Sequence, residues 1–185
     1  MSGGGPASTD TPAGGPVFAD AFRWIIEAEG GPRLVTDTGG LTRWGISSRA
    51  HPHVDIEHLT RDQAEAIYLE SYWRPIRGSA LPAALALVIF DAAVNMGVGT
   101  SVKILQTVLR NVSVDGVAGP ETVAASKLFL PRAELVALCL ELRLRWYADL
   151  AGRDEAAKKL YGSYLYGWRM RVMRLALEAG RWRGL

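Results

Sequence analysis

Apolar residues recur at helical spacing through most of the chain. The first series is Phe18, Phe22, Ile25 and Ile26, and its intervals predict a helix that ends at Glu29, just before a Gly-Gly-Pro break. A rotation of about 100° per residue places Glu29 only about 20° from Phe18 around that helix, on its apolar face. The pattern therefore directs one carboxylate toward the core side at the end of the first helix.

Start and stop signals divide the rest of the chain into further helices. A Thr-x-x-Gln capping box predicts a helix from residue 60 to about Trp73, before Pro75. Residues 83–96 are almost wholly apolar, which predicts the central core helix. The other predicted helices cover residues 101–110, a brief segment from 120, residues 131 to about 150, and residues 154–179.

Two segments lack the helical pattern. Residues 34–47 mix β-branched and aromatic residues around Asp-Thr-Gly-Gly, which predicts a short β-hairpin or an ordered loop. Residues 1–16 hold five Gly and three Pro and no aromatic residue, so we expect a disordered leader or linker there. The predicted fold class is mainly α with one short β-hairpin.

Composition narrows the class of protein. The length of 185 residues suits one domain with its own core, and the single cysteine, Cys139, excludes an internal disulfide. The first residues lack a basic stretch followed by an apolar one, so a Sec signal peptide is not expected. We therefore expect synthesis in the cytoplasm without such a signal. The longest apolar run, residues 80–90, is shorter than the roughly 20 residues of a membrane span, so no stable membrane insertion is expected.

The charge of the chain is unevenly distributed. The net charge is only +2, which argues against a nucleic-acid partner. Residues 143–185 nevertheless hold ten Lys/Arg against four Asp/Glu, whereas residues 1–142 hold eleven against fifteen. The basic C-terminal part is either a solvated helical face or a surface that attracts an anionic polymer.

Glu29 is the main candidate for chemistry. A carboxyl against apolar surroundings is disfavoured in its ionised form, which can keep a glutamic acid protonated as a general acid. The structural alternative is that Glu29 caps the Gly-Gly turn or pairs with an arginine such as Arg33 or Arg43. Inverting glycoside hydrolysis needs a second carboxylate roughly 6.5–9.5 Å away. Asp37 as base and the Thr42 hydroxyl as an orienting group would complete such a site.

Several segments carry a family resemblance. Residues 29–31 and 37–47 resemble the N-terminal signature of glycoside hydrolase family 108, the N-acetylmuramidases found among phage endolysins and bacterial secretion-associated muramidases. Residues 72–77 and 90–99 are similar to later parts of that signature. Residues 115–122 resemble the opening of the peptidoglycan-binding region that usually follows it.

The resemblance implies a lysozyme-like fold and a peptidoglycan hydrolase, a glycosidase that cleaves the β-1,4 bond between N-acetylmuramic acid and N-acetylglucosamine with Glu29 as general acid. It implies a catalytic domain at residues 17–112 and a helical, peptidoglycan-binding-like region at 113–185. In the resemblance, Asp37 and Thr42 are the candidate counterparts of the Asp (or Cys) and Thr of other phage-type lysozymes. The gaps from Glu29 to Asp37 and from Asp37 to Thr42 are each one residue shorter than in those enzymes, so the identity of the second catalytic group stays open. Action on the wall, in the periplasm or outside the cell, would follow lysis or export by a holin or secretion machinery.

Other residues carry two interpretations each. Trp44 and Tyr72 are candidate sugar-stacking walls, with burial in the core as the alternative. Asn95 shares a helix face with Asp91 and is a candidate contact for a sugar N-acetyl group, or else part of a buried hydrogen-bond network. No metal is expected at the histidines and no organic cofactor is expected. The histidines lie at 51, 53 and 58.

Two rival functions remain open at this level. The first is a lytic transglycosylase on the same fold, which uses Glu29 alone and lets the muramic 6-hydroxyl attack. The second is a non-catalytic wall-binding or secretion-accessory protein.

Overall fold

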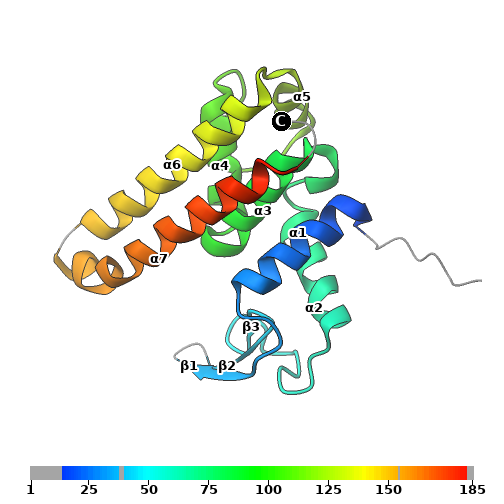
Figure 1. Ribbon diagram of the computed structural model, residues 1–185, viewed down its shortest axis with the longest axis vertical. Helices are drawn as coiled ribbons and strands as arrows, with labels where there is room; N and C mark the ends of the chain where they lie inside the picture. Colours follow the sequence, from blue (N-terminus) through cyan, green and yellow to red (C-terminus); the bar gives the residue numbers. More distant parts are fainter. Residues whose placement is uncertain (1–13, 38–39, 154, 183–185) are drawn as a thin grey trace, which may run out of the picture.

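The computed structural model describes residues 14–37, 40–153 and 155–182. Within these residues the fold is mainly α with one small antiparallel sheet, so the predicted fold class is confirmed (Figure 1). The elements in chain order are α1 (Gly15–Ala28), β1 (Val35–Asp37), β2 (Gly40–Arg43), β3 (Ile46–Ser47), α2 (Arg61–Tyr68), the π-helix η1 (Leu69–Trp73), the 3-10 helix η2 (Gly78–Ala80), α3 (Ala83–Met96), α4 (Val98–Leu109), α5 (Pro120–Leu128), α6 (Arg132–Gly152) and α7 (Glu155–Ala179).

Two helices begin earlier than the sequence pattern predicts. Helix α1 begins at Gly15 with Pro16 in its first turn, so these two residues belong to the helix and not to the leader. Proline suits this place because its fixed φ is helical and its missing N–H has no partner there in any helix. Helix α4 begins at Val98, directly after Gly97, whose φ of +87° allows the sharp change of direction from α3. Residues 1–13 of the leader predicted at residues 1–16 lie outside the described residues.

The helix predicted from residue 60 to Trp73 is present as α2 and η1. Thr60 accepts a hydrogen bond from the backbone N–H of Gln63 at 3.3 Å, and the Gln63 side chain accepts one from the N–H of Thr60 at 2.9 Å. This is the predicted capping box, which satisfies two of the N–H groups that a helix start leaves free. The helix then widens into the π-turn η1 and ends at Trp73.

The predicted hairpin is part of a three-stranded antiparallel sheet. Strand β2 lies in the middle, with Val35 opposite Thr42 on one side and Thr42 opposite Ser47 on the other. The sheet lies beyond the C-terminal end of α1 (Figure 1), so it borders the position of Glu29.

The core is organised around α3. This helix is buried over nearly all its length and packs against α1, α4, α6 and α7, as expected for a helix that is apolar on every face. The rings of Phe18, Trp73 and Phe90 meet at centroid distances of 5.2 to 5.9 Å. Trp73 is buried in this core.

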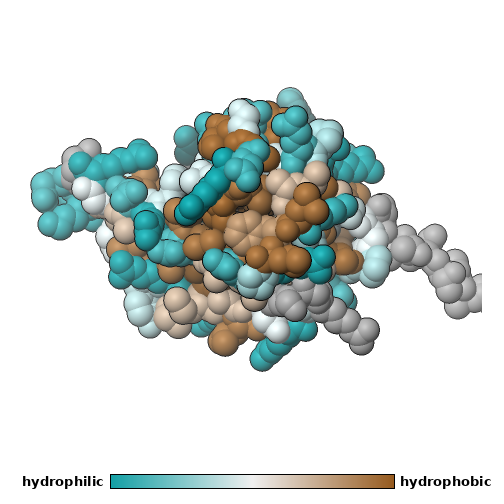
Figure 2. All heavy atoms as spheres, turned by 90° about the horizontal axis from the view of Figure 1, so that it is seen from above, coloured by the Kyte–Doolittle hydropathy of each residue, from teal (hydrophilic) through white to brown (hydrophobic). Residues whose placement is uncertain are grey.

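Helices α6 and α7 form a long antiparallel pair. Tyr147 of α6 and Trp168 of α7 stack with centroids 4.7 Å apart, which joins the two helices. The far end of the pair projects from the body of the molecule, and its surface seen from above is mainly hydrophilic (Figures 1 and 2). Within the described residues, no helix has both the length and the apolar character that crossing a bilayer requires.

Burial predicts that Cys139 is unreactive. Its side chain lies in the core, and removal from water raises the pKa of its thiol to about 12. At about pH 8 the folded protein should therefore resist a thiol-alkylating reagent, whereas protein unfolded in guanidinium should take up one label, measured by mass. Rapid labelling of the folded chain would contradict the packing of α6 described above.

Candidate functional site

Glu29 is the residue that ends α1. Its backbone N–H donates to the carbonyl of Ile25 at 2.8 Å, and the chain then turns through Gly30 and Gly31, both at positive φ. Its side chain retains 25% of its exposed surface. The carboxylate therefore stands at the edge of the core, on the side of α1 that faces α7.

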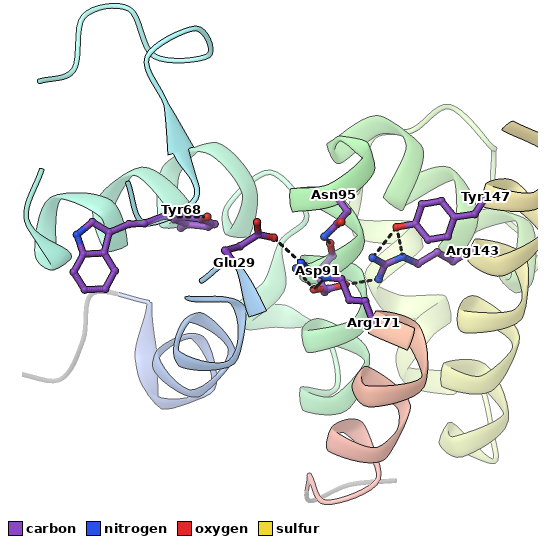
Figure 3. Close-up of polar contacts among 8 residues, drawn as sticks. Glu29, Tyr68, Asp91, Asn95, Arg143, Tyr147 and Arg171 are labelled. Carbon is purple, nitrogen blue, oxygen red and sulfur yellow. Dashed lines mark hydrogen bonds and ion pairs between the residues drawn. The ribbon is translucent and has the colours of Figure 1, made fainter. Parts of the chain in front are cut away.

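One guanidinium connects Glu29 to the core. Arg171 of α7 lies 2.7 Å from Glu29 through Nη1, and its Nε and Nη2 donate to Oδ1 of Asp91 at 2.9 and 2.6 Å (Figure 3). Asp91 is fully buried in α3. A single side chain thus bridges α1, α3 and α7.

The ion pairs continue beyond Asp91. Its Oδ2 accepts a hydrogen bond from Nη1 of Arg143 in α6 at 2.5 Å, and Arg143 also donates to the hydroxyl of Tyr147 at 2.9 and 3.0 Å. Arg143 retains only 1% of its exposed side-chain surface. Along this series negative and positive charges alternate, so each buried charge faces an opposite one, as burial of ions requires.

The carboxylates hold Arg171 in its charged form. Burial lowers the pKa of its guanidinium, but the charges and hydrogen bonds of Asp91 and Glu29 outweigh burial, and the net effect raises that pKa. Every buried side-chain nitrogen and oxygen within the described residues has a hydrogen-bond partner, so this polar cluster is complete.

Tyrosines line the other side of Glu29. Tyr68 lies across from the Asp91–Arg171 pair, with Glu29 between them (Figure 3), and its hydroxyl donates to the carbonyl of Trp44 at 3.1 Å. Burial, and then the negative charge of Glu29, raise the pKa of both Tyr68 and Tyr72. Both phenols therefore stay neutral and lie close enough to Glu29 to feel its charge.

Gly45 allows this close packing. A Cβ at Gly45 would lie 2.5 Å from Oη of Tyr68 and 3.1 Å from Cβ of Glu29, and its φ of +72° is one that other residues rarely adopt. The glycine that follows Trp44 in the family-like motif is therefore needed for both space and backbone conformation.

A cavity of about 320 Å³ adjoins the ion pair. Asn95 lies on its wall, one turn after Asp91 in α3, and is exposed. Its Nδ2 donates to the backbone carbonyl of Asp91 at 3.2 Å. The cavity is lined by Trp24, Ala28, Asn95, Gly167, Trp168, Arg171 and Arg174. Among the residues predicted to contact substrate, Asn95 is the one that this cavity contains.

The predicted stacking residues Trp44 and Tyr72 lie on the tyrosine side of Glu29. Trp44 is half-buried at a φ of +55°, and its indole Nε1 donates to the carbonyl of Leu59 at 3.1 Å. Tyr72 is half-buried, with its ring 5.5 Å from that of Tyr68. Neither lines the cavity beside Arg171.

The structure describes the two hairpin residues of the predicted site to different extents. Thr42 lies in β2, half-buried, and its hydroxyl has no hydrogen bond to Glu29 within the described residues. Asp37 is in β1, but its side chain lies outside what the structure describes. The roles of Asp37 and Thr42 remain predictions.

The expected surroundings of Glu29 need correction. The carboxylate does pair with an arginine, but with Arg171 and not with Arg33 or Arg43. The guanidinium of Arg43 instead donates to the backbone carbonyls of Pro32 and Glu57. A signal for the true arrangement was present in the sequence, because Asp91 within an otherwise apolar helix must find a cation.

Metal ligation has no support from side-chain placement. Across the described residues, no group of three or more His, Cys, Asp or Glu side chains is arranged to hold a metal ion. His58 contacts Asp55 at 2.9 Å on the surface.

Comparison with known proteins places the chain in a family. Residues 22–97 match the family model described as glycosyl hydrolase 108, and residues 100–173 match one described as a predicted peptidoglycan domain. A solved structure, that of Brucella abortus SagA, is 30% identical, with a TM-score of 0.66, and the match covers 91% of this chain and 98% of that one. The chain belongs to the glycosyl hydrolase 108 family. No curated protein matches it.

Membership confirms the resemblance and the lysozyme-like fold expected from the sequence. A glycosyl hydrolase 108 segment joined to a peptidoglycan domain makes the chain a glycoside hydrolase that acts on peptidoglycan. Glu29 and Asp91 lie in the first matched segment, whereas Arg143 and Arg171 lie in the second. The ion pairs at the site therefore cross from one segment to the other.

Removal of the Asp91 charge should destabilise the fold. In Asp91→Asn the buried Arg143 loses its counter-charge, and we expect the free energy of unfolding to fall by about 3–5 kcal/mol in urea titrations. The matched control Asp149→Asn, exposed on α6, should change it by less than about 0.5 kcal/mol. Equal stability of the two variants would contradict the buried ion-pair arrangement.

A second test compares two glycines at positive φ. Gly31 has no atom within 4 Å of an added Cβ, whereas Gly45 has Tyr68 and Glu29 within that distance. Gly31→Ala should cost about 1 kcal/mol for backbone strain alone, and Gly45→Ala about 1–3 kcal/mol more because its neighbours must move. Thermal unfolding of both variants measures the difference, and equal losses would show that Gly45 is not crowded.

Proposed function

We propose that this chain is an N-acetylmuramidase that cleaves the β-1,4 bond between N-acetylmuramic acid and N-acetylglucosamine, with Glu29 as the general acid. The observation that supports this most directly is the place of Glu29. It is a partly exposed carboxylate at the end of α1, within the glycosyl hydrolase 108 segment, beside a cavity lined by two indoles. Residues 17–112 would supply catalysis and residues 113–185 the packed wall-binding part.

The proposed reaction needs a proton at the glycosidic oxygen. Glu29 donates that proton as the bond between the anomeric carbon and this oxygen breaks, through an oxocarbenium-like transition state. A water molecule then attacks the anomeric carbon and loses a proton to a base. Asp37 is proposed as this base and Thr42 as the group that orients the water.

The contact with Arg171 bears on this role. The carboxylate of Glu29 is held by Arg171, so this contact must open before Glu29 can reach a glycosidic oxygen. Arg171 has one contact with Glu29 and two hydrogen bonds with Asp91. We therefore propose that substrate displaces the single contact while the two bonds to Asp91 keep Arg171 in place.

A lytic transglycosylase is the second candidate. Asp91 is the carboxylate that shares Arg171 with Glu29, but it is fully buried and both its oxygens are bound to arginines. It is therefore unsuited to activate water. A reaction that uses Glu29 alone, with the muramic 6-hydroxyl as nucleophile, needs no second carboxylate and yields 1,6-anhydro products.

Peptidoglycan as substrate implies action at the cell wall, in the periplasm or outside the cell. We propose that the chain reaches the wall by lysis or export, with a holin or a secretion machinery as partner.

Substitution of Glu29 tests the assignment. Glu29→Gln should clear suspensions of exposed peptidoglycan at least about 100-fold more slowly than the wild type, because the amide cannot donate the catalytic proton. Glu27→Gln, exposed on the same helix, is the matched control and should keep full activity. Mass spectrometry of the products should show reducing ends, and 1,6-anhydro ends would favour the transglycosylase.

Two results would count against the proposal. Equal clearing by the wild type and Glu29→Gln would remove Glu29 from the mechanism. Absence of clearing by both, with binding to the wall retained, would favour a wall-binding accessory protein.

A further inference from the structure

The cavity beside Arg171 is built from three helices. Trp24 and Ala28 come from α1, Asn95 from the end of α3, and four residues from one face of α7. Its volume of about 320 Å³ is at the small end of the range of ligand pockets. Arg171 lines the cavity and also contacts Glu29, so a ligand bound there would lie on the other side of this guanidinium from the carboxylate that we propose as the acid.

The lining suits a sugar ring. Trp24 and Trp168 are both half-buried and held in place, Trp24 by the guanidinium of Arg171 at 5.7 Å from its ring centroid and Trp168 by the stacked ring of Tyr147. The parts of the two indoles that line the cavity can contact the apolar face of a saccharide. Gly167 contributes no side chain, and an added Cβ there would meet no atom within 4 Å, so the space over Gly167 is open. Asn95 uses one of its N–H groups for Asp91, so its second N–H and its carbonyl oxygen are available to a ligand amide.

The charge at this cavity is not fully balanced. Arg171 is occupied by Asp91 and Glu29, but Arg174, one turn later on α7, is exposed and has no ion-pair partner within the described residues. An arginine without a partner at the rim of a sugar-sized cavity favours an anionic ligand group, above all a carboxylate, which matches its planar fork of donors.

The aromatic surface continues along α7. Tyr164 lies four residues before Trp168, on the same face, and its ring stacks on the indole at a centroid distance of 6.1 Å and an interplanar angle of 22°. Its side chain is 57% exposed. Tyr164, Trp168 and Arg171 therefore form one row that leads from the outer part of α7 to Glu29.

We propose that this cavity is a saccharide subsite that binds a sugar bearing a carboxylate, with Trp24 and Trp168 against the ring, Asn95 on its N-acetyl group and Arg174 on the carboxylate. The glycan strand then runs along α7 over Tyr164. The choice of an N-acetylated sugar rests on the proposed function. In peptidoglycan the carboxylate has two sources, the lactyl group of muramic acid once its peptide is removed and the stem peptide itself.

Binding measurements with three tetrasaccharides test the subsite. The parent protein is Glu29→Gln, so that ligands are not cleaved, and affinity is measured by calorimetry. The first ligand is the neutral chitotetraose, the second is a GlcNAc–MurNAc tetrasaccharide with free lactyl carboxylates, and the third is the same glycan with its stem peptides.

Two additional substitutions have different expected effects. Arg174→Gln should weaken binding about fivefold for the ligands that present the recognised carboxylate and leave chitotetraose unchanged. The matched control Arg169→Gln, exposed on the same helix and outside the cavity, should change none of the affinities beyond a uniform small loss. Asn95→Ala should weaken all three ligands, because all carry N-acetyl groups.

Each outcome decides a point. Weakening with the free-lactyl glycan alone assigns the lactyl carboxylate, and weakening with the peptide-bearing glycan alone assigns the stem peptide. Weakening with both charged ligands shows that Arg174 accepts either carboxylate. Equal weakening for chitotetraose, or an equal effect of Arg169→Gln, overturns the role of Arg174. Unchanged binding in both Arg174→Gln and Asn95→Ala, or no binding by the parent, overturns the subsite. These results do not depend on cleavage, so a failure of Glu29 as the acid would show separately, in the clearing assay.

Discussion

The arrangement of this molecule depends on one buried carboxylate. Asp91 lies without exposure in the most apolar helix of the fold, where an unpaired charge would be strongly disfavoured. It is tolerated because Arg143 and Arg171 approach it from α6 and α7 and bind both of its oxygens. The need to neutralise Asp91 therefore determines where the two C-terminal helices pack, and the packing of α7 in turn brings the third donor of Arg171 to Glu29.

The ion pairs of Asp91 with Arg143 and Arg171 make the two matched segments structurally dependent on each other. A peptidoglycan domain that follows a catalytic segment suggests a tether that holds substrate nearby. Here the second segment contributes the guanidinium that contacts Glu29 and three of the seven residues that line the cavity beside it. The electrostatic environment of the proposed acid is therefore set partly by residues of the segment described as a peptidoglycan domain.

Much of the fold follows from local patterns, whereas the site follows from them only in part. Periodicity located α1 and placed Glu29 on its inner face, and the capping box at Thr60 marks the start of α2. Asp91 could be recognised as a residue in need of a partner. The partners of Asp91 could not be identified from the sequence, because Arg143 and Arg171 are distant from it along the chain and share a basic region with eight other Lys/Arg residues. Trp24, Trp168 and Arg174 were not predicted either, since spacing within α1 and α7 does not reveal which helix faces close a cavity.

The crossing of ion pairs between segments also limits how the protein can change over evolutionary time. Modules joined by a flexible tether can be exchanged freely between genes. In this chain a replacement of residues 100–173 would leave Asp91 buried without a cation unless the incoming module carried two arginines at matching positions. The two segments should therefore be inherited as one unit, with Asp91 and its arginines gained or lost together.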